Sequence, residues 1–284
     1  MVAPGPRQPS RQAGGARPAR GSHCHGQPQA RPDQRRLRSA APATRSGRRL
    51  SVPLVDLPSP NHAPRPDGAV VDILVLHYTE LPLQESLDIL CDGRREHRVS
   101  SHYVLAEDGT TFHLVPEDRT AWHAGQSWWR GREALNATSI GIEIVNLHGD
   151  RHDYPPLQVA ALIELCEGIL ARHPAIVARN VVGHSDIAPK RKIDPGLRFP
   201  WATLAKAGIG LWPRAGARPL EGDFEKALQR FGYAPPIAVP PREIVKAFQR
   251  RYRPARVDGM ADSETKALLA DLLGISSALL TASG

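Results

Sequence analysis

Residues 180–196 constrain the fold more than any other part of the chain. Two valines, typical of a buried strand, lead through a glycine to His184, and a proline-containing loop then runs to Asp194. Imidazole nitrogens and carboxylate oxygens are both good zinc ligands, and a catalytic zinc takes three protein ligands and a water molecule. The stretch by itself fits such a site, and it fits equally a surface loop with a solvated Asp and a capping His. A metal site therefore requires a third ligand from elsewhere in the chain.

The length and charge of the chain bound the class of protein. Its 284 residues suffice for one full-sized domain and a smaller one, and 41% of them are hydrophobic, as in soluble globular proteins. No run approaches the ~20 apolar residues that a membrane-spanning helix needs. The net charge of +8 is concentrated in residues 1–50, where eleven Arg and one Asp give +10 and leave −2 for the rest. A nearly neutral body argues against a nucleic-acid partner.

Residues 1–60 are rich in proline, glycine, arginine, serine and alanine and hold almost no large apolar side chains. Such a segment cannot bury enough surface to offset its chain entropy, so we predict a disordered Arg/Pro-rich extension. It lacks the apolar run of a secretory signal, and no such run precedes Cys24 as it would a lipid-modified cysteine. The remaining cysteines, Cys91 and Cys166, could form a bridge but fit better as small hydrophobic residues on helices.

Two further apolar segments predict strands that carry polar residues with possible chemistry. Residues 70–76 form a nearly continuous apolar run, typical of a strand buried on both faces, and His77 follows it. Residues 139–146 alternate, with isoleucines on one face and Gly141 and Glu143 on the other. The glycine leaves room for a close approach by another group.

The remaining patterns alternate between helices and strands and predict an α/β fold. Helical spacing of apolar residues covers 83–91 and 156–173, and a short helix starts near residue 199. Residues 100–115 predict a β-hairpin around an Asp-Gly turn. Residues 121–129 contain three of the five tryptophans, which fits either the wall of a binding groove or a local hydrophobic cluster under a loop.

The last part of the chain predicts a small helical domain. A segment rich in glycine, proline and arginine precedes it, and we interpret residues 213–220 as a linker. Residues 221–284 then predict three helices, over 224–231, 241–252 and about 263–273, with Asp262 capping the third. About 60 residues can fold as a compact bundle of marginal stability.

Three strand or loop ends thus offer a complete set of zinc ligands, His77, His184 and Asp194, with a fourth position open. Glu143 is a candidate general base for the zinc-bound water. Lys192, two residues before Asp194, is a candidate donor to the oxyanion formed when water attacks a carbonyl. This combination predicts metal-assisted amide hydrolysis. The chain has no G-x-S-x-G motif and no glycine-rich phosphate loop, so serine hydrolases and nucleotide-binding enzymes are disfavoured.

At these residues the chain resembles the zinc-dependent N-acetylmuramoyl-L-alanine amidases of the AmpD/AmiD type, relatives of peptidoglycan-recognition proteins and of phage T7 lysozyme. The motifs that match are residues 76–79, 100–103, 121–125, 138–143, 182–189, 191–196 and 199–201. The resemblance implies a catalytic domain over 61–212, with a mixed central β-sheet flanked by helices. It also implies zinc on the three ligands, Glu143 as base and Lys192 as transition-state stabiliser. The residues expected to contact substrate are Tyr78, Trp122, His123 and Arg191.

The C-terminal segment resembles a small peptidoglycan-binding module with the pattern D-G-x-x-D-x-x-T, found here at residues 258–265. Two domains in this order are similar to the AmiD type, which implies a monomer in the cell envelope or periplasm. Because no export signal is visible, the cytoplasm is the alternative. The implied activity is hydrolysis of the amide bond between N-acetylmuramic or anhydromuramic acid and the L-Ala of peptidoglycan stem peptides, in cell-wall turnover. The competing hypothesis is a non-catalytic peptidoglycan-recognition protein, which would be free to lose some of the five site residues.

Overall fold

The computed structural model describes residues 53–214, 216–233 and 239–282, and these belong to one compact unit. Most of the predicted disordered extension, residues 1–52, lies outside the described residues. Its predicted boundary at residue 60 is too late, because β1 (Leu54–Asp56) already pairs with a strand of the main sheet. Within the described ranges, no helix combines the length and the apolar character that crossing a membrane requires.

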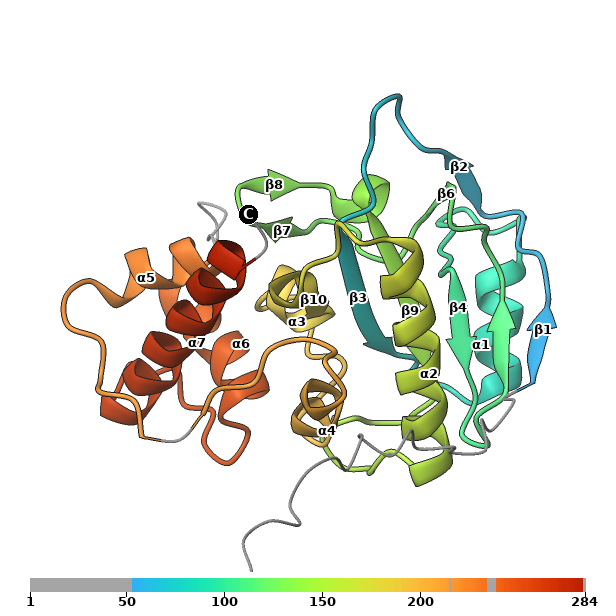
Figure 1. Ribbon diagram of the computed structural model, residues 1–284. Coiled ribbons are helices and arrows are strands. Elements are labelled where there is room, and N and C mark those ends of the chain that lie inside the picture. Colours follow the sequence, from blue (N-terminus) through green and yellow to red (C-terminus); the bar gives the residue numbers. More distant parts are fainter. Residues whose placement is uncertain (1–52, 215, 234–238, 283–284) are drawn as a thin grey trace, which may run out of the picture. The chain divides into compact units, whose positions relative to one another are not determined.

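A mixed six-stranded sheet forms the centre of the fold, as predicted (Figure 1). The strands, in spatial order, are β1, β5 (Thr111–His113), β4 (Tyr103–Leu105), β9 (Ser139–Ile144), β3 (Ile73–Tyr78) and β10 (Val181–Gly183). Only the β4–β5 hairpin is antiparallel, and its turn contains Gly109 with a φ of 91°. Because the other neighbours are parallel, the carboxyl ends of β9, β3 and β10 meet at one edge.

Strand β3 is fully buried, as its continuous apolar sequence predicts. It begins at Ile73 rather than at the predicted Val70, whose side chain is 60% exposed. Leu74 and Leu76 pack on one face with the isoleucines of β9 and with α2 (Pro156–Arg172). Ile73 and Val75 face the other side, where the core continues into the C-terminal helices.

Shorter elements complete the sheet domain. Helix α1 (Leu83–Cys91) has the predicted bounds and covers the end of the sheet near β4 and β5. The small pairs and helices are β2 (His62–Pro64) with β6 (Arg119–Ala121), β7 (Trp128–Trp129) with β8 (Arg132–Glu133), η1 (Leu135–Thr138), η2 (Ala178–Asn180), α3 (His184–Ile187) and α4 (Trp201–Lys206). Cys91 and Cys166 are free thiols on α1 and α2, as expected of small residues on helices.

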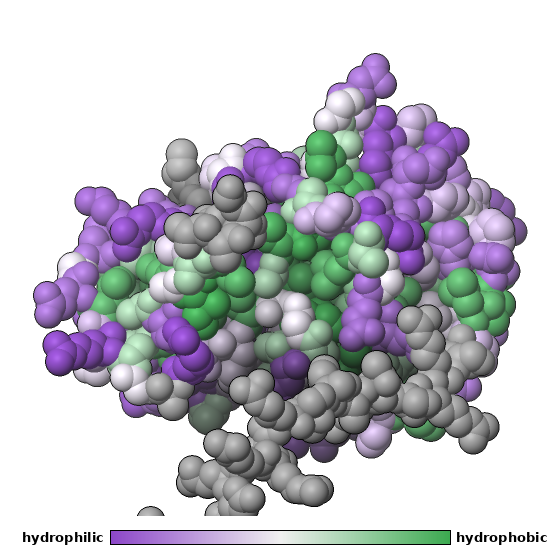
Figure 2. Space-filling model, in the orientation of Figure 1, coloured by the Kyte–Doolittle hydropathy of each residue, from purple (hydrophilic) through white to green (hydrophobic). Residues whose placement is uncertain are grey.

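Three helices form the C-terminal part, α5 (Phe224–Phe231), α6 (Pro241–Tyr252) and α7 (Ser263–Ala282). The first two have the predicted bounds. Helix α7 starts where predicted, and Asp262 caps it by accepting the Thr265 N–H at 3.0 Å, but it runs nine residues past the predicted end. In the same orientation, hydrophobic residues show on the C-terminal helices and beside them, while hydrophilic residues dominate the outer edges (Figure 2).

Candidate metal centre

His77, His184 and Asp194 converge at the carboxyl edge of the sheet. Nδ1 of His77 lies 2.9 Å from Nδ1 of His184, and Oδ2 of Asp194 lies 3.1 and 3.0 Å from these two nitrogens. Four ligands placed tetrahedrally at zinc bond lengths lie about 3.3 Å apart, so these separations suit a single zinc ion. All three side chains are buried, and in the described part of the chain they form the one cluster of this kind.

The strand order explains why these residues meet. His77 lies near the end of β3, and the neighbouring parallel strand β10 leads directly into His184 at the start of α3. The following loop returns Asp194 to the same place, where its carbonyl accepts the Ser185 N–H at 2.9 Å. A Cβ on Gly183 would lie 2.7 Å from Cδ of Pro195, so only glycine permits this return.

Hydrogen bonds leave Nδ1 of both histidines free for a metal. Nε2 of His184 donates to the carbonyl of Ala124 at 3.1 Å. Nε2 of His77 lies 3.0 Å from Nδ1 of His123, so that His77 donates and His123 accepts. A histidine that donates from one ring nitrogen presents the lone pair of the other, which is the arrangement of metal-bound histidines.

His123 belongs to a hydrogen-bonded chain behind His77. Its Nε2 lies 3.2 Å from Oγ of Ser139, and that hydroxyl donates to the carbonyl of Leu135 at 2.7 Å. The hydrogen bonds all run in one direction, because each group donates to the next and the last one donates to a carbonyl. A Cβ on Gly141 would lie 2.4 Å from the His123 ring, so the close approach expected at this glycine is that of an imidazole.

Burial and neighbouring charges set the protonation of the ligands. Burial, followed by the effect of His184, lowers the pKa of His77 to about 4, so its ring is neutral near pH 7. Two neutral imidazoles and one carboxylate would leave a bound zinc with a net positive charge.

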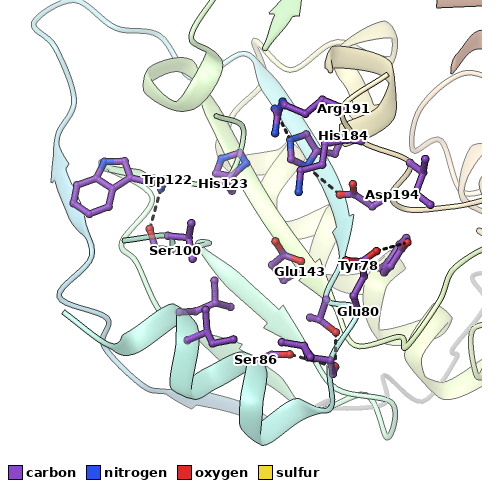
Figure 3. A pocket seen from close by; sticks show the side chains of 17 residues that line it. Tyr78, Glu80, Ser86, Ser100, Trp122, His123, Glu143, His184, Arg191 and Asp194 are labelled. Carbon is purple, nitrogen blue, oxygen red and sulfur yellow. Dashed lines mark hydrogen bonds and ion pairs between the residues drawn. The ribbon is translucent and has the colours of Figure 1, made fainter. Parts of the chain in front are cut away.

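Glu143 lies beside the ligands on β9, directly opposite His77 in the strand register. Its Oε1 is 4.0 Å from Nδ1 of His77, and its side chain is 17% exposed, on the wall of the cleft. Burial first, and then the charge of Asp194, raise the pKa of Glu143 well above its usual value. Figure 3 shows Glu143, His184 and Asp194 directed toward the same space.

The cleft in front of the ligands is walled by four segments of the chain. They are the end of β3 with the residues after it, helix α1, residues 122–123 and the loop before Asp194, and residues 99–100 join them in lining the cleft. Lys192 is exposed on the wall formed by this loop. Every residue predicted to act on substrate therefore borders one cleft: Tyr78, Trp122, His123, Glu143, Arg191 and Lys192.

The predicted substrate contacts have different surroundings. The Tyr78 hydroxyl donates to Oε1 of Glu80 at 3.0 Å. Trp122 borders the cleft, and the guanidinium carbon of Arg98 lies 5.1 Å from the centre of its ring. Nη2 of Arg191 donates to the carbonyls of Ala124 and Gln126 at 2.8 and 2.6 Å, so this side chain joins two loops of the cleft.

Both interpretations of the tryptophan-rich segment hold, each for a different tryptophan. Trp122 borders the cleft, as a groove wall would. Trp129 is fully buried and packs edge-on against Phe231 and Tyr233 of the C-terminal part, as a hydrophobic cluster would.

Sequence reasoning missed three polar residues of the site. Ser139 ends the chain behind His77, and Glu80 holds the Tyr78 hydroxyl with a backbone φ of 59°, a left-handed conformation uncommon outside glycine. Oδ1 of Asn136 accepts the N–H groups of His123 and Ala124 at 3.2 and 2.7 Å. None of the three carries a sequence signal: Asn136 and Ser139 act on His123, which folding brings close, and Glu80 acts on Tyr78 two positions before it through an ordinary side-chain hydrogen bond.

The fold and a buried ligand set that could hold a metal fit one class, the amidases, and comparison with known proteins identifies the family. Residues 67–197 match the Amidase_2 family, described as N-acetylmuramoyl-L-alanine amidase. The chain is 40% identical over 232 residues to the N-acetylmuramoyl-L-alanine amidase AmiD of Escherichia coli K12, covering 72% of this chain and 82% of AmiD. It is 37% identical over 162 residues to the 1,6-anhydro-N-acetylmuramyl-L-alanine amidase AmpD of Enterobacter cloacae, covering 51% of this chain and 85% of AmpD.

Solved structures agree with this assignment. AmpDh3 of Pseudomonas aeruginosa, in complex with anhydromuramic pentapeptide, matches with a TM-score of 0.66 and 38% identity, over 72% of this chain and 92% of that one. E. coli AmiD, in complex with the substrate anhydro-N-acetylmuramic acid-L-Ala-D-gamma-Glu-L-Lys, matches with a TM-score of 0.65 and 38% identity, over 74% and 91%. The chain belongs to the N-acetylmuramoyl-L-alanine amidase family, and the resemblance and fold class predicted from its sequence are confirmed.

Proposed function

We propose that this enzyme hydrolyses the amide bond between N-acetylmuramic or anhydromuramic acid and the L-Ala of peptidoglycan stem peptides, using zinc held by His77, His184 and Asp194. The observation that carries the proposal is the meeting of these three buried ligands with Glu143, which lines one cleft together with His184 and Asp194. The two structural relatives that hold anhydromuramic peptides support the choice of substrate class.

The donor set fits zinc in chemistry and in spacing. Two imidazoles present unprotonated Nδ1 atoms, a carboxylate completes the set, and the three donor atoms lie within 3.1 Å of one another. When bound, zinc supplies a Lewis acid and a water molecule of lowered pKa.

Glu143 is proposed as the general base and acid. It accepts the proton of the attacking water and returns it to the nitrogen of L-Ala as the amide bond breaks. A carboxylate with a raised pKa suits this exchange, because it is a stronger base than an ordinary carboxylate. Lys192, exposed on the cleft wall, is proposed to donate to the oxyanion that develops on the carbonyl oxygen.

Tyr78, Trp122 and Arg191 are proposed to shape the substrate groove. The Trp122 ring offers an apolar face to a sugar or peptide, and Arg191 holds two loops of the groove together. For His123 we propose a positioning role instead of the substrate contact predicted from sequence. Both of its ring nitrogens are engaged with other side chains, and one of those is the ligand His77.

The remaining predictions from sequence concern the whole protein. Four of them stay predictions: a peptidoglycan-binding domain over 221–284, a linker over 213–220, a monomeric state and an envelope location. Affinity of the chain for intact peptidoglycan, measured by co-sedimentation with purified sacculi, tests the binding role of the helices.

The test of the activity is mass spectrometry of a muramyl-tripeptide incubated with the purified protein. We expect free tripeptide to form, to disappear with a chelator and to return when zinc is added. The His184→Ala variant should lose both zinc and turnover because one of three ligands is gone, whereas His113→Ala, which removes a hydrogen bond to the exposed Asp56, should keep both. If the folded, zinc-loaded protein leaves both the tripeptide substrate and longer muropeptides intact, the chain is a peptidoglycan-recognition protein instead.

A further inference from the structure

Two consecutive arginines of α6, Arg250 and Arg251, reach out of the C-terminal helices to two aspartates near metal ligands. One lies in α3, the helix that begins with His184, and the other lies in the segment after β9, beside the residues that follow Asp194. Helix α6 packs against α3, the short helix that begins with His184 (Figure 1). Arg251 contacts Asp186, 65 positions earlier in the chain, and Arg250 contacts Asp150, 100 positions earlier.

Arg251 binds Asp186, two residues after His184. Oδ2 of this buried carboxylate accepts Nη1 of Arg251 at 2.8 Å and the Gly183 N–H at 2.8 Å, while Oδ1 accepts the hydroxyl of Tyr233. The guanidinium also lies over the ring of Trp201, with 3.9 Å between its carbon and the ring centre. Two of the three donors to Asp186 thus come from the C-terminal part, and a buried carboxylate that loses a donor is strongly destabilised.

Arg250 binds Asp150, which buttresses the segment after Asp194. Nη1 of Arg250 lies 2.7 and 2.8 Å from the two carboxylate oxygens, and Oδ1 also accepts the Leu197 N–H at 2.8 Å. The neighbouring backbones touch, because a Cβ on Gly196 would lie 2.3 Å from the carbonyl carbon of Gly149. A shift of Asp150 would therefore move the loop that returns Asp194 to the site.

Apolar packing holds the same junction. Ile187 of α3 and Val182 of β10 share one core with residues of α5, α6 and α7. Trp129, on the strand that follows the cleft wall, packs against Phe231 and Tyr233 at ring-centre distances of 6.2 and 5.1 Å. The loops of two ligands therefore rest on the C-terminal helices through both polar and apolar contacts.

We propose that the C-terminal helices position the metal ligands: α6 holds the His184 loop through Asp186 and the Asp194 loop through Asp150. Arg250, Arg251 and Tyr233 are then positioning residues of the hydrolytic site. This role is separate from any affinity of the helices for peptidoglycan, and it rests on the proposed zinc site. It makes metal binding sensitive to contacts that touch neither the metal nor the substrate.

The test uses the full chain with Arg250→Gln and Tyr233→Phe, which each remove one contact and spare the buried guanidinium of Arg251. The matched control is Arg253→Gln, the residue that directly follows α6, whose partners Asp262, Glu264 and Thr265 all lie within the C-terminal part. Zinc affinity is measured by competition with a chromophoric chelator, the visible spectrum is recorded with Co²⁺ in place of zinc, and the Tm is measured without metal.

We expect zinc affinity to fall about three- to tenfold in Arg250→Gln and Tyr233→Phe, somewhat less than the 10–100-fold typical of direct partners of metal ligands. The Co²⁺ spectrum should change with it, and Arg250→Lys should recover part of the loss. Arg253→Gln should keep wild-type affinity and spectrum even where its Tm falls.

Wild-type affinity and spectrum in both variants would overturn the proposal while leaving the zinc site intact. An equal loss in Arg253→Gln would overturn it as well, because affinity would then follow the stability of the helices and not their contacts with the loops. Failure of the wild-type protein to bind zinc would overturn the proposed function together with this inference.

Discussion

At the scale of single residues, the site depends on which nitrogen of each histidine carries a proton. His77 and His184 donate from Nε2 to His123 and to the Ala124 carbonyl, so both turn a lone pair on Nδ1 toward Asp194. Burial keeps His77 neutral by lowering its pKa to about 4, and a neutral ring binds a metal without first losing a proton. The hydrogen bonds at Nε2 thus direct Nδ1 of both rings toward the space that a metal would occupy.

Replacement of Glu143 by Gln separates metal binding from proton transfer. The amide has nearly the same shape but cannot accept a proton, so zinc content should stay at the wild-type level while turnover falls ~10²–10⁴-fold. Metal analysis and the muramyl-tripeptide assay measure the two effects on one sample. Hydrolysis by Glu143→Gln at the wild-type rate would mean that another group is the base.

Replacement of His123 by Ala tests the hydrogen-bonded chain behind His77. Without an acceptor for its Nε2–H, His77 can rotate or change tautomer, so we expect zinc affinity to fall ~10–100-fold. Chelator competition measures this, with Trp122→Phe as control, because Trp122 lies next in sequence and borders the cleft but contacts no ligand nitrogen. Equal zinc affinity in the two variants would contradict a positioning role for His123.

At the scale of elements, a partly buried carboxylate, Glu117, fastens the segment after the β4–β5 hairpin to the end of α2. Its oxygens accept Arg172 at 2.7 and 3.0 Å, the Tyr103 hydroxyl at 2.8 Å and His173 at 2.8 Å. Burial alone would raise the pKa of Glu117, but these hydrogen bonds outweigh it and lower that pKa to about 2. The folded chain therefore favours the ionised form of this carboxylate more than the unfolded chain does.

This pKa predicts how the stability depends on pH. Because the folded pKa of Glu117 lies below its ordinary value of 4.5, its contribution is complete above about pH 5 and is lost as the pH falls toward 2. The shift corresponds to up to about 3 kcal/mol of unfolding free energy at neutral pH. In urea unfolding, Glu117→Gln should have a clearly lower free energy of unfolding than wild type at pH 7. The difference between the two free energies should be smaller at pH 3. A gap that stays constant over this range would contradict the lowered pKa.

At the scale of the whole molecule, the sheet domain and the C-terminal helices share a core. One apolar cluster contains Ile73 and Val75 of the central strand together with residues of α5, α6 and α7. Ion pairs of Arg250 and Arg251 cross the same junction. Neither part could unfold without exposing apolar surface of the other, so the two are expected to lose structure together.

Calorimetry should therefore show a single unfolding transition for the sheet domain and the helices, moved to higher temperature by zinc. Trp129→Ala, at the centre of the junction, should lower the free energy of unfolding by about 3–5 kcal/mol and keep one transition. Its half-buried neighbour Trp128 is the matched control, and Trp128→Ala should lower the free energy of unfolding by a smaller amount. Two separate transitions in the wild-type protein would show that the helices fold as an independent domain.

The sequence by itself determined the elements and the donors of the site. Apolar spacing predicted α1, α5 and α6 with their observed bounds, and the Asp-Gly pair predicted the β4–β5 turn. These features depend on residues close together in the chain, so local patterns suffice to predict them. His77, Glu143, His184 and Asp194 were found because a metal-dependent hydrolase needs those side chains at the ends of neighbouring strands.

Only the tertiary structure decided how these donors are held. His123 became a partner of His77 because folding brings the loop after β6 against β3, with 3.0 Å between Nδ1 of His123 and Nε2 of His77, and no local pattern predicts that contact. The junction of Trp129 with the C-terminal helices, and the reach of Arg250 and Arg251 to aspartates far back in the chain, likewise arise from packing. Such contacts join segments that are distant in sequence, and their energy depends on burial, which the folded chain alone defines.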